Sequence, residues 1–137
     1  MLSYKRKYLF FTSVILLVLS LVSCDEKLDG KTIISASVSR VGESMLDVKK
    51  PHITYNQENS EELQTFVDAI KKAKKVSGIV DVATPGYLIT LTYEDKTISN
   101  YSLWIDDAGG SIMNENDSNH IYTLRKDLID DLNKLVE

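Results

Sequence analysis

The chain has 137 residues, 26% of them charged, and a formal net charge of −4 at pH 7. This length fits one domain of ordinary size behind a short N-terminal segment. The acidic balance argues against nucleic acid as a partner, because binding to phosphates depends on Lys and Arg. Cys24 is the single cysteine, which excludes a disulfide within the chain.

Residues 1–23 have the pattern of a bacterial lipoprotein signal peptide. Lys5, Arg6 and Lys7 precede fifteen mostly apolar residues that end at Val22. This run is shorter than the roughly 20 residues that a membrane-spanning helix needs, but it suits the apolar part of a signal. The segment Leu21-Val22-Ser23-Cys24 resembles a lipobox, so we predict cleavage directly before the cysteine.

Cys24 is then expected to carry a diacylglyceryl group, because a thiolate is the nucleophile that can take the lipid as a thioether. The predicted location is the extracytoplasmic face of the cell membrane, with anchoring through lipid instead of a spanning helix. An ordinary secretory signal and an uncleaved membrane anchor are the alternatives. Three of the sixteen Lys and Arg lie in the signal, so the mature chain has thirteen basic and twenty acidic residues, a net charge of −7.

Residues 24–31 are mostly polar and predict a lipidated tether, and residues 32–137 are expected to form one domain. Ile34, Ala36 and Val38 alternate with serines, which is the period of a strand with one buried face. A second short extended segment is expected over residues 52–55.

An amphipathic helix is expected from Asn59 or Ser60. Its apolar residues recur at helical spacing, and Gly78 is expected to end it. The lysines near that end are expected to form a solvated face that complements the helix dipole, and contact with anionic lipid headgroups is the alternative. The apolar residues are Leu63, Phe66, Val67, Ile70 and Ala73, and the lysines are Lys71, Lys72, Lys74 and Lys75.

Alternating runs over residues 87–93 and 97–105 predict an antiparallel hairpin, with Trp104 on the face opposite to Tyr101. Residues 111–113 and 121–124 predict two further short strands. Leucines at helical spacing, with Ile129 and Val136 beside them, predict a C-terminal helix; they are Leu124, Leu128, Leu132 and Leu135. The expected fold class is α+β, an antiparallel sheet of about four to five strands with two amphipathic helices packed on one face.

A set of short motifs resembles the YhfM-like domain of small lipoproteins from Bacillus and its relatives. The set includes Gly78-Ile79-Val80-Asp81, Tyr93-Glu94-Asp95, Leu103-Trp104-Ile105 and Ile121-Tyr122-Thr123, and the resemblance covers roughly residues 35–136. It implies a lipoprotein signal ahead of one domain, and it implies no particular activity. Where the family tends to carry Asp-Thr-His-Thr, this chain has Asp117-Ser118-Asn119-His120.

The polar segment 114–120 is the best candidate site, because it gathers oxygen ligands and one imidazole within seven residues. It is not an EF-hand loop. Counted from Asn114, the sixth and twelfth positions are Asn119 and Arg125, where an EF-hand needs a glycine and an acid. A less regular cation or polar-ligand site is possible, and so is a strand connection whose side chains cap their own backbone. We take Trp104, Asp117 and His120 as candidate residues of a partner-binding surface.

The sequence contains no recognisable catalytic constellation. With Cys24 assigned to the lipid and only His52 and His120 available, thiol catalysis and a three-histidine zinc site are excluded. We therefore predict no catalytic residue, no metal and no cofactor. The favoured function is a non-catalytic module that binds an envelope protein or a cell-wall component. The alternative is a hydrolase with an unrecognised carboxylate pair, which two carboxylates facing each other across a pocket would support.

Overall fold

The computed structural model describes residues 26–78 and 81–137, so the predicted signal peptide and Cys24 lie outside the described residues. Two helices and one short 3-10 turn accompany the strands in these ranges. The strands are β1 (Lys27–Leu28), β2 (Lys31–Val41), β3 (Val48–Asn56), β4 (Lys74–Lys75), β5 (Tyr87–Tyr93), β6 (Ile98–Asp106), β7 (Gly109–Asn114) and β8 (Tyr122–Thr123). The helices are α2 (Ser60–Lys72) and α3 (Lys126–Val136), and the 3-10 turn is η1 (Glu115–Asp117).

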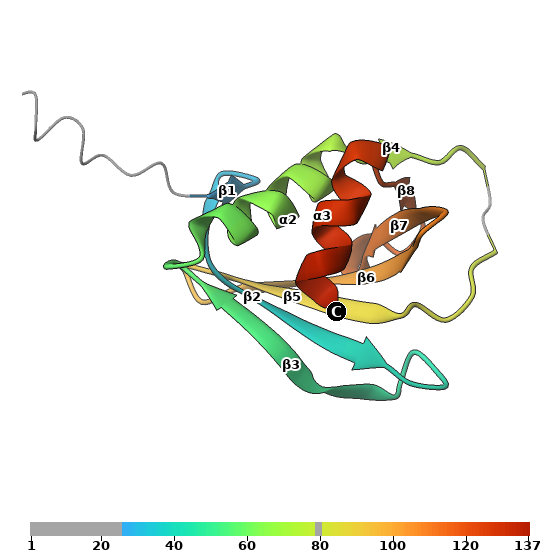
Figure 1. The fold of residues 1–137 in the computed structure, drawn as a ribbon, viewed down its shortest axis with the longest axis horizontal. Helices are drawn as coiled ribbons and strands as arrows, with labels where there is room; N and C mark the ends of the chain where they lie inside the picture. Colours follow the sequence, from blue (N-terminus) through green and yellow to red (C-terminus); the bar gives the residue numbers. More distant parts are fainter. Residues whose placement is uncertain (1–25, 79–80) are drawn as a thin grey trace, which may run out of the picture.

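The strands form one antiparallel sheet that curls into a half-barrel around α2 and α3 (Figure 1). Their order is β1-β2-β5-β6-β7-β8-β4, and β3 pairs with β2 off this path. The expected α+β sheet of about four to five strands is therefore wrong: within residues 26–78 and 81–137 the fold is mostly sheet, with eight strands and two helices.

The missed strands are β1 and β4, and each has only two residues, whereas β8 lies within the strand predicted over residues 121–124. Two residues cannot show the alternation that identifies a strand in a sequence. A local signal did exist for β1, because Asp29 and Gly30 join it to β2 with φ angles of 52° and 77°. Positive φ at both central residues is typical of a type I′ hairpin turn, for which Asp-Gly is a preferred dipeptide.

The fold thus begins within the segment that we predicted to be a tether. The backbone N–H of Ile33 donates to the carbonyl of Glu26 at 2.9 Å. Leu28, which the sequence places among polar neighbours, is only 3% exposed and belongs to the core. The described domain therefore starts at least as early as Glu26, and not at residue 32.

Irregular pairing in β2 changes which residues face the core. The register between β2 and β5 shifts between Ile33 and Ser35, and such a bulge bends a strand and re-aims its side chains. Ile33 is consequently buried at 1% exposure, whereas simple alternation predicted Ile34 in that position. Ala36 and Val38 are buried as expected.

Helix α2 ends at Lys72, six residues before the glycine that we expected to end it. Ala73 already has extended backbone angles, φ −65° and ψ 142°. Lys74 and Lys75 then pair with Thr123 and Tyr122 as strand β4. Two of the four clustered lysines are therefore edge-strand residues, and the prediction of a single helical lysine face is wrong.

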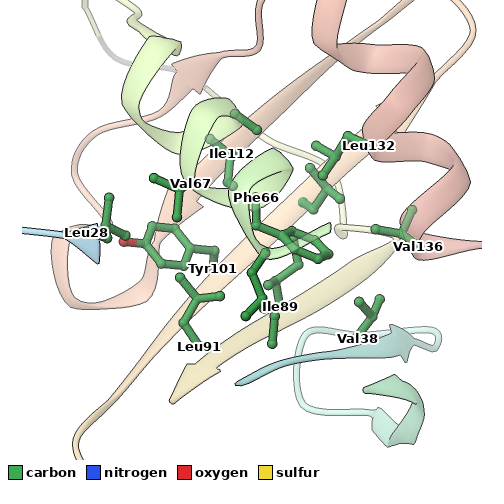
Figure 2. Close-up of a cluster of buried hydrophobic side chains, with 14 of the residues drawn as sticks. Leu28, Val38, Phe66, Val67, Ile89, Leu91, Tyr101, Ile112, Leu132 and Val136 are labelled. Carbon is green, nitrogen blue, oxygen red and sulfur yellow. The ribbon is translucent and has the colours of Figure 1, made fainter. Parts of the chain in front are cut away.

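The core lies between the concave face of the sheet and the two helices, as Figure 2 shows for Phe66 above Ile89 and for Leu132 and Val136 of α3. Phe66 is 1% exposed, and the other three are fully buried. The buried line of α3 is Ile129, Leu132 and Val136. Leu124 is also buried, whereas Leu128 and Leu135 of the predicted leucine stripe are half-buried.

The C-terminal end of α3 is held by side chains from the β2–β3 hairpin. The hydroxyl of Tyr55 donates to the Leu135 carbonyl at 2.7 Å, and Nε2 of His52 bonds the Val136 carbonyl at 2.8 Å. The last carbonyls of a helix have no partner within it, so these contacts satisfy groups that otherwise need water. His52 therefore has a structural role.

The two described helices have 13 and 11 residues. Neither of them is long and apolar enough to cross a membrane.

Candidate functional site

The groups of the predicted site segment 114–120 form hydrogen bonds with one another around η1. The side-chain oxygen of Asn114 accepts the backbone N–H of Asn116 at 2.9 Å. Nδ1 of His120 lies 2.9 Å and 3.0 Å from the two carboxylate oxygens of Asp117, and the His120 backbone N–H donates to the Asp117 carbonyl at 3.2 Å. The structure therefore brings Asp117 and His120 together as a local pair on the surface.

Trp104 is bonded to a different segment of the chain. Its indole N–H donates to the carbonyl of Ala83 at 2.7 Å, and this hydrogen bond connects β6 to the segment that precedes β5. Side chains alternate along a strand, which places Trp104 on the face of β6 opposite to Tyr101. In the part of the chain that the structure describes, no hydrogen bond or ion pair joins Trp104 to Asp117 or His120.

Asp117 does line a cleft of about 370 Å³ beside the start of the fold. The cleft lies where the β1–β2 turn, the end of α2 and the β6–β7–β8 part of the sheet meet. We call it the Tyr101 cleft. Its lining residues are Leu28, Asp29, Ile70, Lys71, Tyr101, Ile112, Asn114, Asp117 and Tyr122.

The Tyr101 cleft has an apolar base with polar groups above it. Leu28 and Ile112 are each 3% exposed, and the hydroxyl of Tyr101 points toward Leu28 (Figure 2). Lys71, Asp29 and Asp117 are exposed and carry charges of both signs. The cleft volume falls within the roughly 300–1,000 Å³ that is common for small-molecule sites.

The phenol of Tyr101 stays neutral at physiological pH. Burial raises the pKa of Tyr101 well above its ordinary value, and the neighbouring Tyr93 and the charge of Asp29 act in the same direction. The side-chain amide of Asn114 acts weakly in the opposite direction. Tyr101 therefore offers the cleft a hydroxyl that can donate or accept a hydrogen bond, and it does not offer a nucleophilic phenolate.

The described ranges contain no group of three or more His, Cys, Asp or Glu side chains that could hold a metal ion. Within the cleft, the ionic side chains are Lys71 and two carboxylates, Asp29 and Asp117. Of these three side chains, only that of Asp117 is bonded to another side chain of the described residues, the imidazole of His120. The arrangement is therefore suited to hold a ligand by charge and hydrogen bonding.

Sequence reasoning found Asn114 and Asp117, within the candidate segment 114–120, but missed the rest of the cleft. Asp29 and Leu28 were assigned to a tether, and Lys71 was treated only as part of a lysine face. The Asp29-Gly30 dipeptide was the one available signal, because a hairpin there folds the segment back against β2. Nothing in the sequence indicates that α2 ends beside this turn.

Comparison with known proteins gives one family match. The family model described as YhfM protein matches residues 39–137. No curated protein and no solved structure shows significant similarity to the chain. The matched region begins within β2 and includes every later element of the fold, which is well over half of the chain. The chain therefore belongs to the YhfM protein family.

Proposed function

We propose that this protein is a lipid-anchored module on the extracytoplasmic face of the cell membrane, and that it binds an envelope component in the Tyr101 cleft without catalysing a reaction. The single observation that carries the proposal is the cleft itself, with charges of both signs above an apolar base. The basic N-terminus, the short apolar run and the lipobox-like segment before Cys24 support the location.

The proposed anchor lies very close to the cleft. Only Asp25 separates Cys24 from Glu26, whose carbonyl is already bonded to β2. Four residues span at most about 14 Å, so Leu28 at the base of the cleft lies within that distance of the lipidated residue. A ligand in the cleft would therefore be held near the membrane surface.

The location is tested by metabolic labelling with a fatty-acid analogue. We expect the wild-type protein to be labelled and the Cys24→Ala variant to be unlabelled and released from the membrane. Equal labelling of both proteins would refute lipid attachment at Cys24.

The charges indicate the class of ligand. Lys71 suits a carboxylate or another anionic group, whereas Asp29 and Asp117 suit an ammonium group. Tyr101 and Tyr122 add hydroxyl groups near apolar surface, which suits the aliphatic part of the same molecule. A short peptide with a free amine and a free carboxylate, such as a cell-wall stem peptide, has this combination.

Binding is tested by adding soluble cell-wall peptide fragments to the isotopically labelled protein and following amide chemical shifts. We expect shifts at the β1–β2 turn, the end of α2 and η1. Lys71→Gln should raise the Kd about tenfold or more, and Lys75→Gln, a matched change outside the cleft, should leave it within about twofold. Equal effects of the two substitutions, or shifts located elsewhere, would refute the cleft as the binding site.

Hydrolysis is a second candidate, because two carboxylates, Asp29 and Asp117, line the same cleft. Glycoside hydrolysis uses a pair of carboxyl groups, one as acid and one as base or nucleophile. Asp117 is already bonded to His120 within its own turn, which favours a positioning role. If the protein releases products from wall fragments, and if Asp29→Asn and Asp117→Asn each abolish that release, the protein is a hydrolase. Binding without turnover supports the non-catalytic binding module.

A further inference from the structure

Two side chains of opposite charge line the Tyr101 cleft without pairing to each other. Asp29 comes from the turn between β1 and β2, and Lys71 comes from the last turn of α2. Both residues are exposed, and none of the ion pairs among the described residues includes either of them. The fold thus holds a carboxylate and an ammonium apart along one cleft. A molecule that carries both charges can bridge them.

The backbone fixes the position of Asp29. Asp29 and Gly30 form a two-residue turn with φ angles of 52° and 77°. Leu28 and Lys31, on either side of the turn, pair with each other, and such a turn leaves its central residues little conformational freedom. The charge of Asp29 also acts on the base of the cleft, because it adds to burial, the main cause, in raising the pKa of Tyr101. Asp29 is therefore a pre-positioned negative charge near the Tyr101 phenol.

Asp117, the other carboxylate of the cleft, already has a partner. Its two oxygens lie 2.9 Å and 3.0 Å from Nδ1 of His120. An ammonium group that binds Asp117 must share this carboxylate with the imidazole, whereas at Asp29 it displaces no side chain of the described residues. A hydrogen bond to an ion contributes most where no protein donor has to be given up for it. The ammonium group of a ligand is therefore expected at Asp29.

The apolar base of the cleft restricts the ligand further. Leu28 and Ile112 form part of this base and are each 3% exposed. The part of the ligand between its ammonium and its anion should therefore be aliphatic. A simple cation or a polyamine lacks the anion that Lys71 needs. A phosphoethanolamine lipid headgroup carries both charges, but its aliphatic part is shorter than the stem of a lysine-type side chain. A peptide with an amine on a long aliphatic side chain fits this arrangement best.

We infer that Asp29 determines the specificity of the Tyr101 cleft, and that it selects wall peptides whose side-chain amine is free. This step rests on the proposed binding function. Cross-linking of two wall peptides converts such an amine into an amide, which carries no charge and leaves the Asp29 carboxylate without an ionic partner. The domain therefore distinguishes uncross-linked peptide from cross-linked peptide.

The test measures whether the amine of the ligand must be free. The probes are two short synthetic wall peptides, each with one lysine-type residue and a free C-terminal carboxylate. The side-chain amine is free in one peptide and acetylated in the other, and the N-terminal amine is acetylated in both. Each peptide is titrated by calorimetry against the full chain in lipid nanodiscs. We expect the wild type to bind the free-amine peptide about tenfold or more tightly than the acetylated peptide.

Asp29→Asn should remove this preference, because it removes the charge and keeps the shape of the side chain. The Kd of the free-amine peptide should rise to within about twofold of that of the acetylated peptide, which itself should stay within about twofold of its wild-type value. Asn-Gly suits the turn as well as Asp-Gly does, so the unfolding temperature should stay that of the wild type. Asp107→Asn makes the same change at an exposed carboxylate outside the cleft, and this matched control should leave the preference intact.

Equal binding of the two peptides by the wild type would overturn the inference, and so would a preference that survives Asp29→Asn. A preference that Asp117→Asn removes and Asp29→Asn leaves would overturn it by assigning the ammonium to Asp117. Tighter binding of phosphoethanolamine than of the free-amine peptide would also overturn it, because the site would then suit a lipid headgroup.

Lys71→Gln separates this inference from the proposed function, because both peptides carry the carboxylate that Lys71 is expected to bind. If the wild type binds both peptides equally and Lys71→Gln weakens both, the cleft binds peptide and only the selection by Asp29 is wrong. If neither peptide binds, the proposed function and this inference are both wrong.

Discussion

Replacing Leu28 by alanine tests whether β1 belongs to the folded core. Leu28 is 3% exposed and packs in the same cluster as the sheet and the helices, although the sequence places it in a predicted tether. The substitution removes three carbons from this contact and leaves the backbone pairing of β1 unchanged. If β1 is part of the core, the free energy of unfolding must fall.

The expected loss is about 2 kcal/mol. Buried Leu→Ala substitutions cost about 2–5 kcal/mol, and the cost is smallest where the surroundings or water can fill the space. Leu28 lines the open Tyr101 cleft, so we expect the lower end of that range. For a domain of this size, about 2 kcal/mol corresponds to a fall of about 8 °C in Tm.

The measurement is urea unfolding of a chain that starts at Asp25, and unfolding is monitored by far-UV circular dichroism. Leu46→Ala is the matched control, because it makes the same chemical change at a side chain that is 96% exposed. We expect the control to stay within about 0.5 kcal/mol of wild type. If Leu28→Ala also stays within that limit, β1 does not pack as described and residues 26–31 are a tether after all.

Three further substitutions test individual contacts. Tyr55→Phe removes the hydrogen bond to the Leu135 carbonyl and should lower the free energy of unfolding by about 1 kcal/mol, as measured by urea unfolding; no change would mean that water replaces the hydroxyl. Trp104→Phe removes the bond to the backbone before β5 and should cost about 1 kcal/mol while leaving ligand titrations of the Tyr101 cleft unchanged; weaker binding would place Trp104 in the site. The pKa of Asp95 is lowered from 3.8 to about 2, mainly by the hydrogen bond from the hydroxyl of Thr97. The contribution of the ionised Asp95 to the free energy of unfolding is therefore present above pH 3.8 and lost as the pH falls through about 2. The stability advantage of wild type over Asp95→Asn should therefore shrink between about pH 4 and pH 2, and an advantage that does not vary with pH would contradict this assignment.

Much of the candidate site could not be predicted from the sequence, because its residues come from distant segments. Asp117 and His120 are three residues apart, and their pairing within a polar turn follows from local chemistry. Asp29 and Lys71, in contrast, meet only because the end of α2 packs beside the β1–β2 turn. The hydrogen bond from the Trp104 indole to Ala83 likewise joins residues that are 21 positions apart, and no local pattern indicates it.

The sequence by itself determined the regular elements with long periodic patterns. Helices α2 and α3 and the β5–β6 hairpin follow from repeated apolar spacing over seven or more residues, where many positions report the same buried face. The tertiary structure alone decided the size and curvature of the sheet. Strands β1 and β4 each form only because a neighbouring strand offers backbone partners, and two residues carry no period of their own. The bulge in β2, which places Ile33 instead of Ile34 in the core, likewise depends on pairing with β5 and not on the residues of β2 alone.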